Sequence, residues 1–179
     1  DEGITLGACI ILCQHFSVGA GSCDVTQQLP LCSQLQVTSG ALSNLINEKM
    51  WNKKINCYSY VNNITSEYSS VFTPSSFMPL FINIASANRA KEMAWIAETN
   101  FKCKMPSVSF DNPEFSTDYW RGPTWLNIAY FAAKGLKNYG FPVADKIREN
   151  ILDMCHKNKD GIYENYNSIT GEGQRYNNF

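Results

Sequence analysis

The stretch from Trp125 to Leu136 carries the strongest helical pattern in the 179-residue chain. Its apolar side chains recur every three or four residues, which is the spacing of one face of an α-helix. Gly140 and Pro142 follow this stretch and predict where the helix ends. Several of the apolar residues are alanines, which would let another helix approach closely. The stripe consists of Trp125, Ile128, Ala129, Ala132, Ala133 and Leu136.

Four further segments show the same period, and we expect a helix in each. The first begins at Ala41, the second is capped by Ser75 or Ser76, the third follows Asn88, and the last begins at Val143. Their stripes are Leu42, Leu45, Ile46 and Met50; Phe77, Leu80, Phe81 and Ile84; Ala90, Met93, Ala94 and Ala97; and Val143, Ile147, Ile151, Met154 and Cys155.

Long polar and aromatic loops separate these helices. Residues 52–73 are predicted to form a loop with room for a short hairpin, and residues 101–119 and the segment after Asp160 are predicted to be loops. No series of strands is evident, so the sequence predicts an all-α fold. Residues 1–40 are rich in Cys, Ser and Gln and are expected to form a poorly defined segment before a helical domain at 41–179.

The charge pattern excludes several functions. The net charge is -1 and no basic run occurs, which argues against a nucleic-acid-binding protein. No apolar stretch reaches the ~18–20 residues of a membrane span, so we expect no membrane segment in this chain. We expect no cofactor either.

The cysteines and histidines do not have the spacing of the ligands in a metal site. There are seven cysteines, no CxxC pair and only two histidines, His15 and His156, so we expect no zinc site. Cys9 and Cys13 have the spacing of two core thiols on a helix, although a disulfide among the first four cysteines is an alternative. The tripeptide Asn63-Ile64-Thr65 fits an N-glycosylation acceptor and thus an extracytoplasmic protein.

The heptad YWRGPTW at 119–125 is the densest group of candidate binding residues. Planar aromatic faces and a guanidinium fork suit a sugar ring and its hydroxyls. The Gly122-Pro123 step predicts that the heptad lies at the start of a helix, with Pro123 at the first helical position. An aromatic loop packed on a core is the alternative. For Arg121 the alternative is a tie between loops, and for Trp125 it is core packing.

Four ordered motifs resemble the C-terminal half of the catalytic domain of glycoside hydrolase family 63. They are FMPLF at 77–81, SVSFDNPEF at 107–115, YWRGPTW at 119–125 and GIYENYNSITGEG at 161–173. The resemblance runs from about Ala41 to the end. It implies part of an (α/α)6 toroid and an inverting mechanism with an Asp acid and a Glu base, acting on an oligosaccharide substrate.

The resemblance also suggests which residues form the site. The family's base matches Glu164 in Glu164-Asn165-Tyr166, which we favour over Glu172 because two glycines flank Glu172. Asp111, Glu114 and Asp118 are interpreted as solvated loop acids. The expected sugar-binding residues are Tyr119, Trp120, Arg121, Gly122, Trp125, Tyr163 and Tyr166.

Two departures from the family's pattern leave two functions open. The Trp-Asp motif that carries the family's acid has no match in residues 1–40, and the Gly-Trp-Ser/Thr motif that follows TGEG is missing before Phe179. We therefore expect the chain to be part of a catalytic domain. One hypothesis is an inverting hydrolase of α-glucosidic or related α-linked bonds; the other is a carbohydrate-binding or structural piece that lacks the acid.

Overall fold

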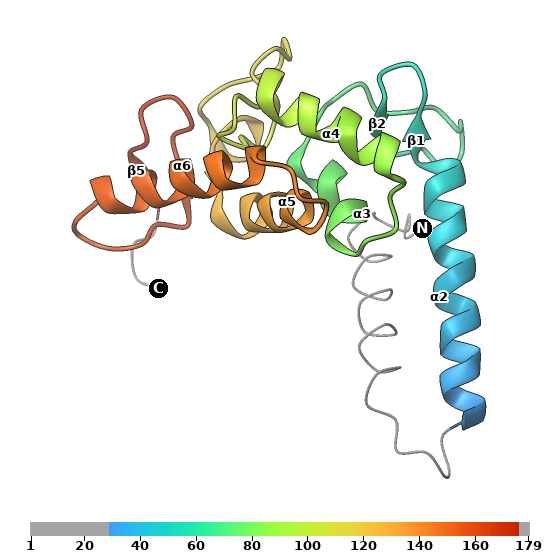
Figure 1. Cartoon of the computed structure of the whole chain (residues 1–179). Coiled ribbons are helices and arrows are strands. Elements are labelled where there is room, and N and C mark those ends of the chain that lie inside the picture. Colours follow the sequence, from blue (N-terminus) through green and yellow to red (C-terminus); the bar gives the residue numbers. More distant parts are fainter. Residues whose placement is uncertain (1–28, 176–179) are drawn as a thin grey trace. The chain divides into compact units, whose positions relative to one another are not determined.

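The computed structural model describes residues 29–175, and their side chains from residue 38 onward. Cys9, Cys13, Cys23 and His15 lie outside the described residues, as does the side chain of Cys32. The chain divides into two compact units at Ser69–Ser70. Figure 1 shows the elements along the chain.

The first unit contains one long helix and a hairpin. Helix α2 spans Leu29–Lys49, so our prediction that a helix begins at Ala41 was wrong by twelve residues. The polar side chains before Ala41 hid this helix, because its apolar stripe is weak there. The hairpin joins β1 (Trp51–Asn52) to β2 (Cys57–Tyr58), in the loop where a hairpin was considered.

The hairpin packs through its aromatic side chains. Trp51 is paired with Tyr58, and their ring centroids lie 4.9 Å apart in an edge-to-face arrangement. The buried Tyr58 hydroxyl donates to the Oδ1 of Asn47 on α2, at 2.6 Å. The Asn63-Ile64-Thr65 tripeptide lies in an exposed turn beyond the hairpin.

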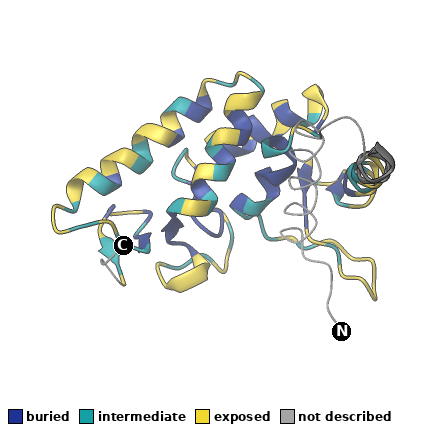
Figure 2. Ribbon diagram, turned by 90° about the horizontal axis from the view of Figure 1, so that it is seen from below, coloured by how far each residue is buried: buried dark blue, intermediate teal, exposed yellow. Residues whose placement is uncertain are grey.

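The second unit contains the other predicted helices in the predicted order. They are a 3-10 turn η1 (Pro74–Phe77) that leads into α3 (Met78–Phe81), α4 (Ala87–Thr99), α5 (Leu126–Asn138) and α6 (Val143–Lys157). The prediction that Ser75 or Ser76 caps one of them was wrong, because both serines lie within a 3-10 turn that Thr73 precedes. The Ser86 hydroxyl caps α4 by accepting from the Arg89 N–H at 3.4 Å. Figure 2 shows that buried residues follow one side of the helices and exposed residues the other.

Helix α5 lies at the centre of this unit and packs against both α3 and α6. Its buried residues are Ala129, Ala132, Gly135 and Leu136. A Cβ placed on Gly135 would stand 2.8 Å from the backbone nitrogen of Phe81. The predicted close approach of another helix to this small-residue face is therefore confirmed, and α3 is that helix.

The second unit also contains a small sheet that the sequence did not reveal. Strands β3 (Thr124–Trp125), β4 (Asn165–Tyr166) and β5 (Gly173–Gln174) pair antiparallel in the order β3-β4-β5. Each strand has two residues, which is too short for an alternating pattern to be recognised. The sheet joins the segment before α5 to the loop after α6.

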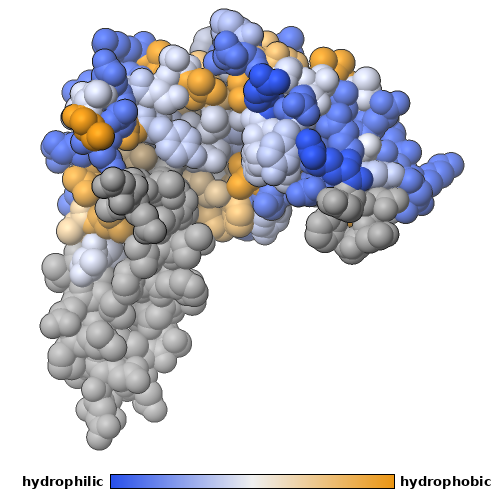
Figure 3. Space-filling view, turned by 180° about the vertical axis from the view of Figure 1, so that it is seen from behind, coloured by the Kyte–Doolittle hydropathy of each residue, from blue (hydrophilic) through white to orange (hydrophobic). Residues whose placement is uncertain are grey.

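The described surface is mixed in polarity. Figure 3 shows one face, on which hydrophobic residues lie among hydrophilic ones. Large exposed apolar side chains include Ile64, Trp95, Tyr130 and Ile169. Of the helices at 29–175, none combines the length and apolar character needed to cross a membrane.

Candidate functional site

The heptad forms a stack of aromatic rings directly before α5. The rings of Trp120 and Trp125 are parallel, with centroids 3.8 Å apart and planes at 1°. Tyr119 meets both indoles edge-on, at 6.1 Å from Trp120 and 5.5 Å from Trp125. The predicted place of the heptad at a helix start is confirmed. However, Pro123 is not the first helical residue, because β3 intervenes and α5 begins at Leu126.

Backbone hydrogen bonds fold the heptad into a tight loop, and Gly122 is required at its centre. The Ser116 N–H donates to the Arg121 carbonyl at 2.8 Å, and the Gly122 N–H donates to the Ser107 hydroxyl at 2.9 Å. A Cβ on Gly122 would stand 1.8 Å from the Ser116 carbonyl oxygen. Only glycine therefore lets the chain pass this close to Ser116.

The small sheet brings the backbone next to Glu164 into contact with the strand that carries Trp125. Trp125 is paired with Asn165, and Thr124 with Tyr166. Glu164 directly precedes Asn165, so its backbone lies one residue beyond the pair that includes Trp125. The sequence segments 119–125 and 161–173, which are far apart along the chain, thus meet in one structure.

Tyr163 and Tyr166, which lie on either side of Glu164 in the sequence, contact each other. The Tyr163 N–H donates to the Tyr166 hydroxyl at 3.0 Å, and the two rings meet edge-on at 6.0 Å. The Tyr163 ring packs over Gly173, where a Cβ would stand 2.2 Å from a ring carbon. Tyr166 is fully buried, and burial raises the pKa of its phenol.

The other glutamate of the segment, Glu172, has a different environment. It is exposed at the end of the turn between β4 and β5, where its carboxylate accepts from the Thr170 hydroxyl at 3.2 Å. The turn is closed by hydrogen bonds from Gly171 N–H to the Asn167 carbonyl at 2.7 Å and from Asn167 N–H to the Glu172 carbonyl at 2.8 Å. Glu164 is half-buried at the strand instead.

Two asparagines in this region differ sharply in their hydrogen bonding. The Asn158 amide donates to the carbonyls of Met154 and Gly171, at 2.6 and 2.9 Å, and accepts from Gly173 N–H at 2.8 Å. Asn165 is fully buried, and neither its Nδ2 nor its Oδ1 has a hydrogen-bond partner among the described residues. Asn165 is the residue that sequence reasoning passed over; its place between Glu164 and Tyr166 was the available signal.

The candidate sugar-binding residues fall into an exposed and a buried group, with the half-buried Tyr163 between them. Tyr119 and Trp120 are 45% and 44% exposed, and Arg121 is also exposed. Trp125, Tyr166 and Gly122 are buried and hold the exposed residues in place. Asp111, Glu114 and Asp118 are exposed loop acids, as predicted.

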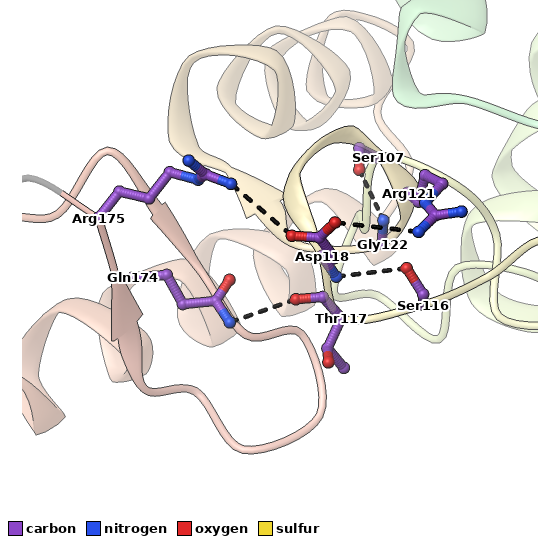
Figure 4. A network of polar contacts seen from close by, with 8 residues as sticks. All are labelled: Ser107, Ser116, Thr117, Asp118, Arg121, Gly122, Gln174 and Arg175. Carbon is purple, nitrogen blue, oxygen red and sulfur yellow. Dashed lines mark hydrogen bonds and ion pairs between the residues drawn. The ribbon is translucent and has the colours of Figure 1, made fainter.

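Asp118 has an additional role that the sequence did not show. Figure 4 shows its carboxylate between two guanidinium groups, with Arg121 at 3.9 Å and Arg175 at 3.7 Å. Arg175 follows β5 directly. Its contact with Asp118 therefore joins the loop at residues 116–122, here called the aromatic loop, to the last strand of the sheet.

Cavities elsewhere in the second unit do not involve these residues. One of about 270 Å³ lies between α5 and α6, and one of about 470 Å³ lies beside Trp95 on α4 and Phe141. In the part of the chain that the structure describes, no three His, Cys, Asp or Glu side chains are placed to hold a metal ion.

Comparison with known proteins points to one enzyme group. The mannosylglycerate hydrolase of Rubrobacter radiotolerans is 29% identical over 150 residues, covering 79% of this chain and 34% of that protein. The mannosylglycerate hydrolase of Thermus thermophilus is 30% identical over 132 residues, covering 71% of this chain and 31% of that protein. The chain thus spans about a third of the length of these relatives.

Solved structures share the fold. A glycoside hydrolase family 63 mannosylglycerate hydrolase of Thermus thermophilus, in complex with glucose, superposes with a TM-score of 0.81 at 24% identity, over 94% of this chain and 43% of that one. The neutral trehalase Nth1 of Saccharomyces cerevisiae superposes with a TM-score of 0.69 at 18% identity, over 94% and 35%. The fold is therefore part of an (α/α)6 toroid.

The family match covers most of the sequence. Residues 26–179 match the mannosylglycerate hydrolase MGH1-like glycoside hydrolase domain. With the shared fold, this confirms the resemblance to glycoside hydrolase family 63. The chain belongs to the MGH1-like glycoside hydrolase family.

Proposed function

We propose that this chain contributes the general base and part of the sugar-binding surface of an inverting α-glycosidase. One observation supports the proposal: Trp125 of the Trp120–Trp125 stack is paired with Asn165, the residue that directly follows Glu164. A carboxylate next to exposed aromatic rings is the arrangement that glycoside hydrolysis needs. The rings bind the sugar's apolar face, and the carboxylate activates a water molecule.

The exposed residues of the heptad suit a sugar ring. Trp120 offers a ring whose other face is covered by Trp125, so a sugar stacks on a platform that is already rigid. Arg121 carries a fork of donors next to this platform, which can bind vicinal hydroxyls. These contacts orient the ring, and the rigidity of the stack limits the entropy lost on binding.

Glu164 is better placed than Glu172 to act as the base. A base must be held at the wall of the site, on the face opposite the leaving group, with the two carboxyls ~6.5–9.5 Å apart in inverting enzymes. Glu164 is anchored by the strand pair that follows it, whereas Glu172 bonds within its own turn. The acid partner is expected to be an aspartate, as in the family that the motifs resemble.

The substrate is proposed to be an α-linked glucoside or a related α-linked sugar. The similar proteins are named for mannosylglycerate and trehalose, and one solved relative contains glucose. These compounds, together with nigerose and kojibiose, are the first to be tested.

The alternative is a chain that binds carbohydrate without cleaving it. It is favoured by the lack of a Trp-Asp motif in residues 1–40. General acid catalysis typically contributes ~10²–10⁴-fold, so a protein without the acid would keep sugar binding and lose turnover. We expect the 179-residue chain by itself to show no useful hydrolysis.

The test uses the protein together with the sequence that flanks this chain in its gene. Glu164→Gln and Glu172→Gln are compared on mannosylglycerate, trehalose, nigerose and kojibiose, with NMR to identify the first anomer released. We expect Glu164→Gln to lower kcat by at least ~10²-fold, Glu172→Gln to stay near wild type, and the anomeric configuration to invert. The opposite order of the two variants, or retained configuration, would contradict the proposal. Binding without turnover in the wild type would support the alternative.

A further inference from the structure

Gln174 and Arg175, at the end of the small sheet, contact three consecutive residues of the aromatic loop. Gln174 Nε2 donates to the Thr117 carbonyl at 3.3 Å, the Arg175 guanidinium lies 3.7 Å from the Asp118 carboxylate, and the same guanidinium lies 4.3 Å from the centre of the Tyr119 ring. Figure 4 shows the first two of these contacts. Two neighbouring side chains therefore hold a continuous stretch of the loop.

One of these three loop residues, Tyr119, has a strained backbone conformation. Tyr119 has φ = 44°, a left-handed conformation that is uncommon for a bulky residue. Such a conformation persists only where its surroundings fix it. Here the Tyr119 carbonyl accepts from the Trp125 indole N–H at 3.3 Å, and the Tyr119 ring lies under Arg175. The backbone and the ring are thus each held by a different element.

Arg175 also has a short structural link to Glu164. It follows Gln174, which is paired with Asn165, and Asn165 follows Glu164. The guanidinium on the aromatic loop and the candidate base are therefore connected through one pair of adjacent strands.

We propose that Arg175 is a positioning residue that, with Asp118, fixes the aromatic loop relative to Glu164 and so sets the affinity for the sugar. This inference rests on the proposed function of the aromatic stack. Arginine suits the role because its flat guanidinium stacks on Tyr119 while its N–H groups face Asp118. Lysine keeps the charge but lacks the flat face.

The experiment compares Arg175→Met, Arg175→Lys and Asp118→Asn in the full protein. The matched control is Arg148→Met, because Arg148 makes a similar exposed contact with Asp145, at 3.9 Å, on α6. We expect Arg175→Met to raise KM on the order of tenfold, the effect of losing one cation–π contact and one ion pair, while kcat changes little. Arg175→Lys and Asp118→Asn should fall between Arg175→Met and wild type.

A second readout does not depend on turnover. Trypsin can cut after the exposed Arg121, and a loosened loop is cut faster. We expect faster cleavage at Arg121–Gly122 in Arg175→Met than in Arg148→Met, and weaker glucose binding by tryptophan fluorescence. If the wild type hydrolyses none of the sugars, the proposed function fails. Trypsin cleavage and glucose binding would still test whether Arg175 holds the aromatic loop in place. Equal cleavage and equal glucose affinity in the two variants would overturn the inference, as would a fall in kcat at unchanged KM.

Discussion

The indoles of Trp120 and Trp125 lie in parallel contact at 3.8 Å, yet Trp120 is 44% exposed and Trp125 only 6%. One stack therefore has an outer ring that faces solvent and an inner ring that belongs to the core. Trp125 also belongs to β3 and directly precedes α5. The alternatives considered for the heptad, a sugar platform and core packing, are thus divided between its two tryptophans.

Replacing the two tryptophans separately should show this division. Trp125→Ala removes a buried ring and is expected to lower the free energy of unfolding by about 3–5 kcal/mol. Trp120→Ala loses the ring contacts with Trp125 and Tyr119 at an exposed position and is expected to lower it by only about 1–2 kcal/mol. Urea unfolding followed by far-UV circular dichroism measures both. Equal losses would mean that the outer ring is as much part of the core as the inner one.

The two helical glycines should respond to alanine with opposite signs. A Cβ added to Gly40 on α2 would have no atom within 4 Å. Gly40→Ala should therefore raise the free energy of unfolding by about 0.5–1 kcal/mol. Gly135→Ala gains the same helix preference but places its Cβ 2.8 Å from the Phe81 nitrogen and 3.1 Å from the Leu80 Cβ. We expect it to lower the melting temperature, because α3 must move away. A higher melting temperature for Gly135→Ala would show that α3 can move away from Gly135 at little cost in stability.

Asn165 and Asn158 provide a matched pair for buried amides. Asn165→Leu replaces two polar atoms that have no partner in the described part of the chain, and is expected to leave stability unchanged or raise it. Asn158→Leu breaks three hydrogen bonds and should cost about 2 kcal/mol or more. Thermal unfolding of the two variants decides this. A loss for Asn165→Leu as large as that for Asn158→Leu would reveal a partner for the Asn165 amide.

Tyr166 should make stability fall in alkaline solution. Burial raises the pKa of its phenol above the ordinary value of 10.0, so the folded protein retains a proton that the unfolded chain loses. This contribution is fully present below pH ~10 and is lost as the pH rises from there through the folded pKa. The free energy of unfolding should therefore fall less between pH ~9 and ~11 in Tyr166→Phe than in wild type. Tyr130→Phe, at an exposed position of α5, controls for the loss of a hydroxyl. Parallel curves of the free energy of unfolding against pH for Tyr166→Phe and wild type would contradict the expectation.

The helices of the second unit were predictable because their evidence is local. The stripe from Trp125 to Leu136 and the stop at Gly140 and Pro142 correspond to α5 and its end within two residues. The early start of α2 was missed because Ser, Gln and Thr dilute its apolar face. Pro123 was misplaced because a two-residue strand separates it from the helix, and such a strand has no pattern of its own.

The site was predictable as a set of residues but not as an arrangement. The heptad and the segment with Glu164 were identified separately, and nothing in either predicts that Trp125 pairs with Asn165. That pairing depends on contacts between residues 40 positions apart along the chain. The contact between Asp118 and Arg175 was not predicted for the same reason: Asp118 was interpreted as a solvated loop acid, and Arg175 looks like an ordinary surface charge until the chain is folded.

The double pairing of Asn165 has a consequence for how such chains can vary in length. Asn165 is matched with Trp125 on one side and with Gln174 on the other, so its register is fixed twice. An insertion in the turn at 167–172 would break the hydrogen bonds that close it and so disturb the pairing of β4 with β5. A single deletion within β4 would turn every side chain to the opposite face of the sheet. Natural and engineered variants should therefore differ in length outside residues 164–174, and the distance between Glu164 and the strand should not change.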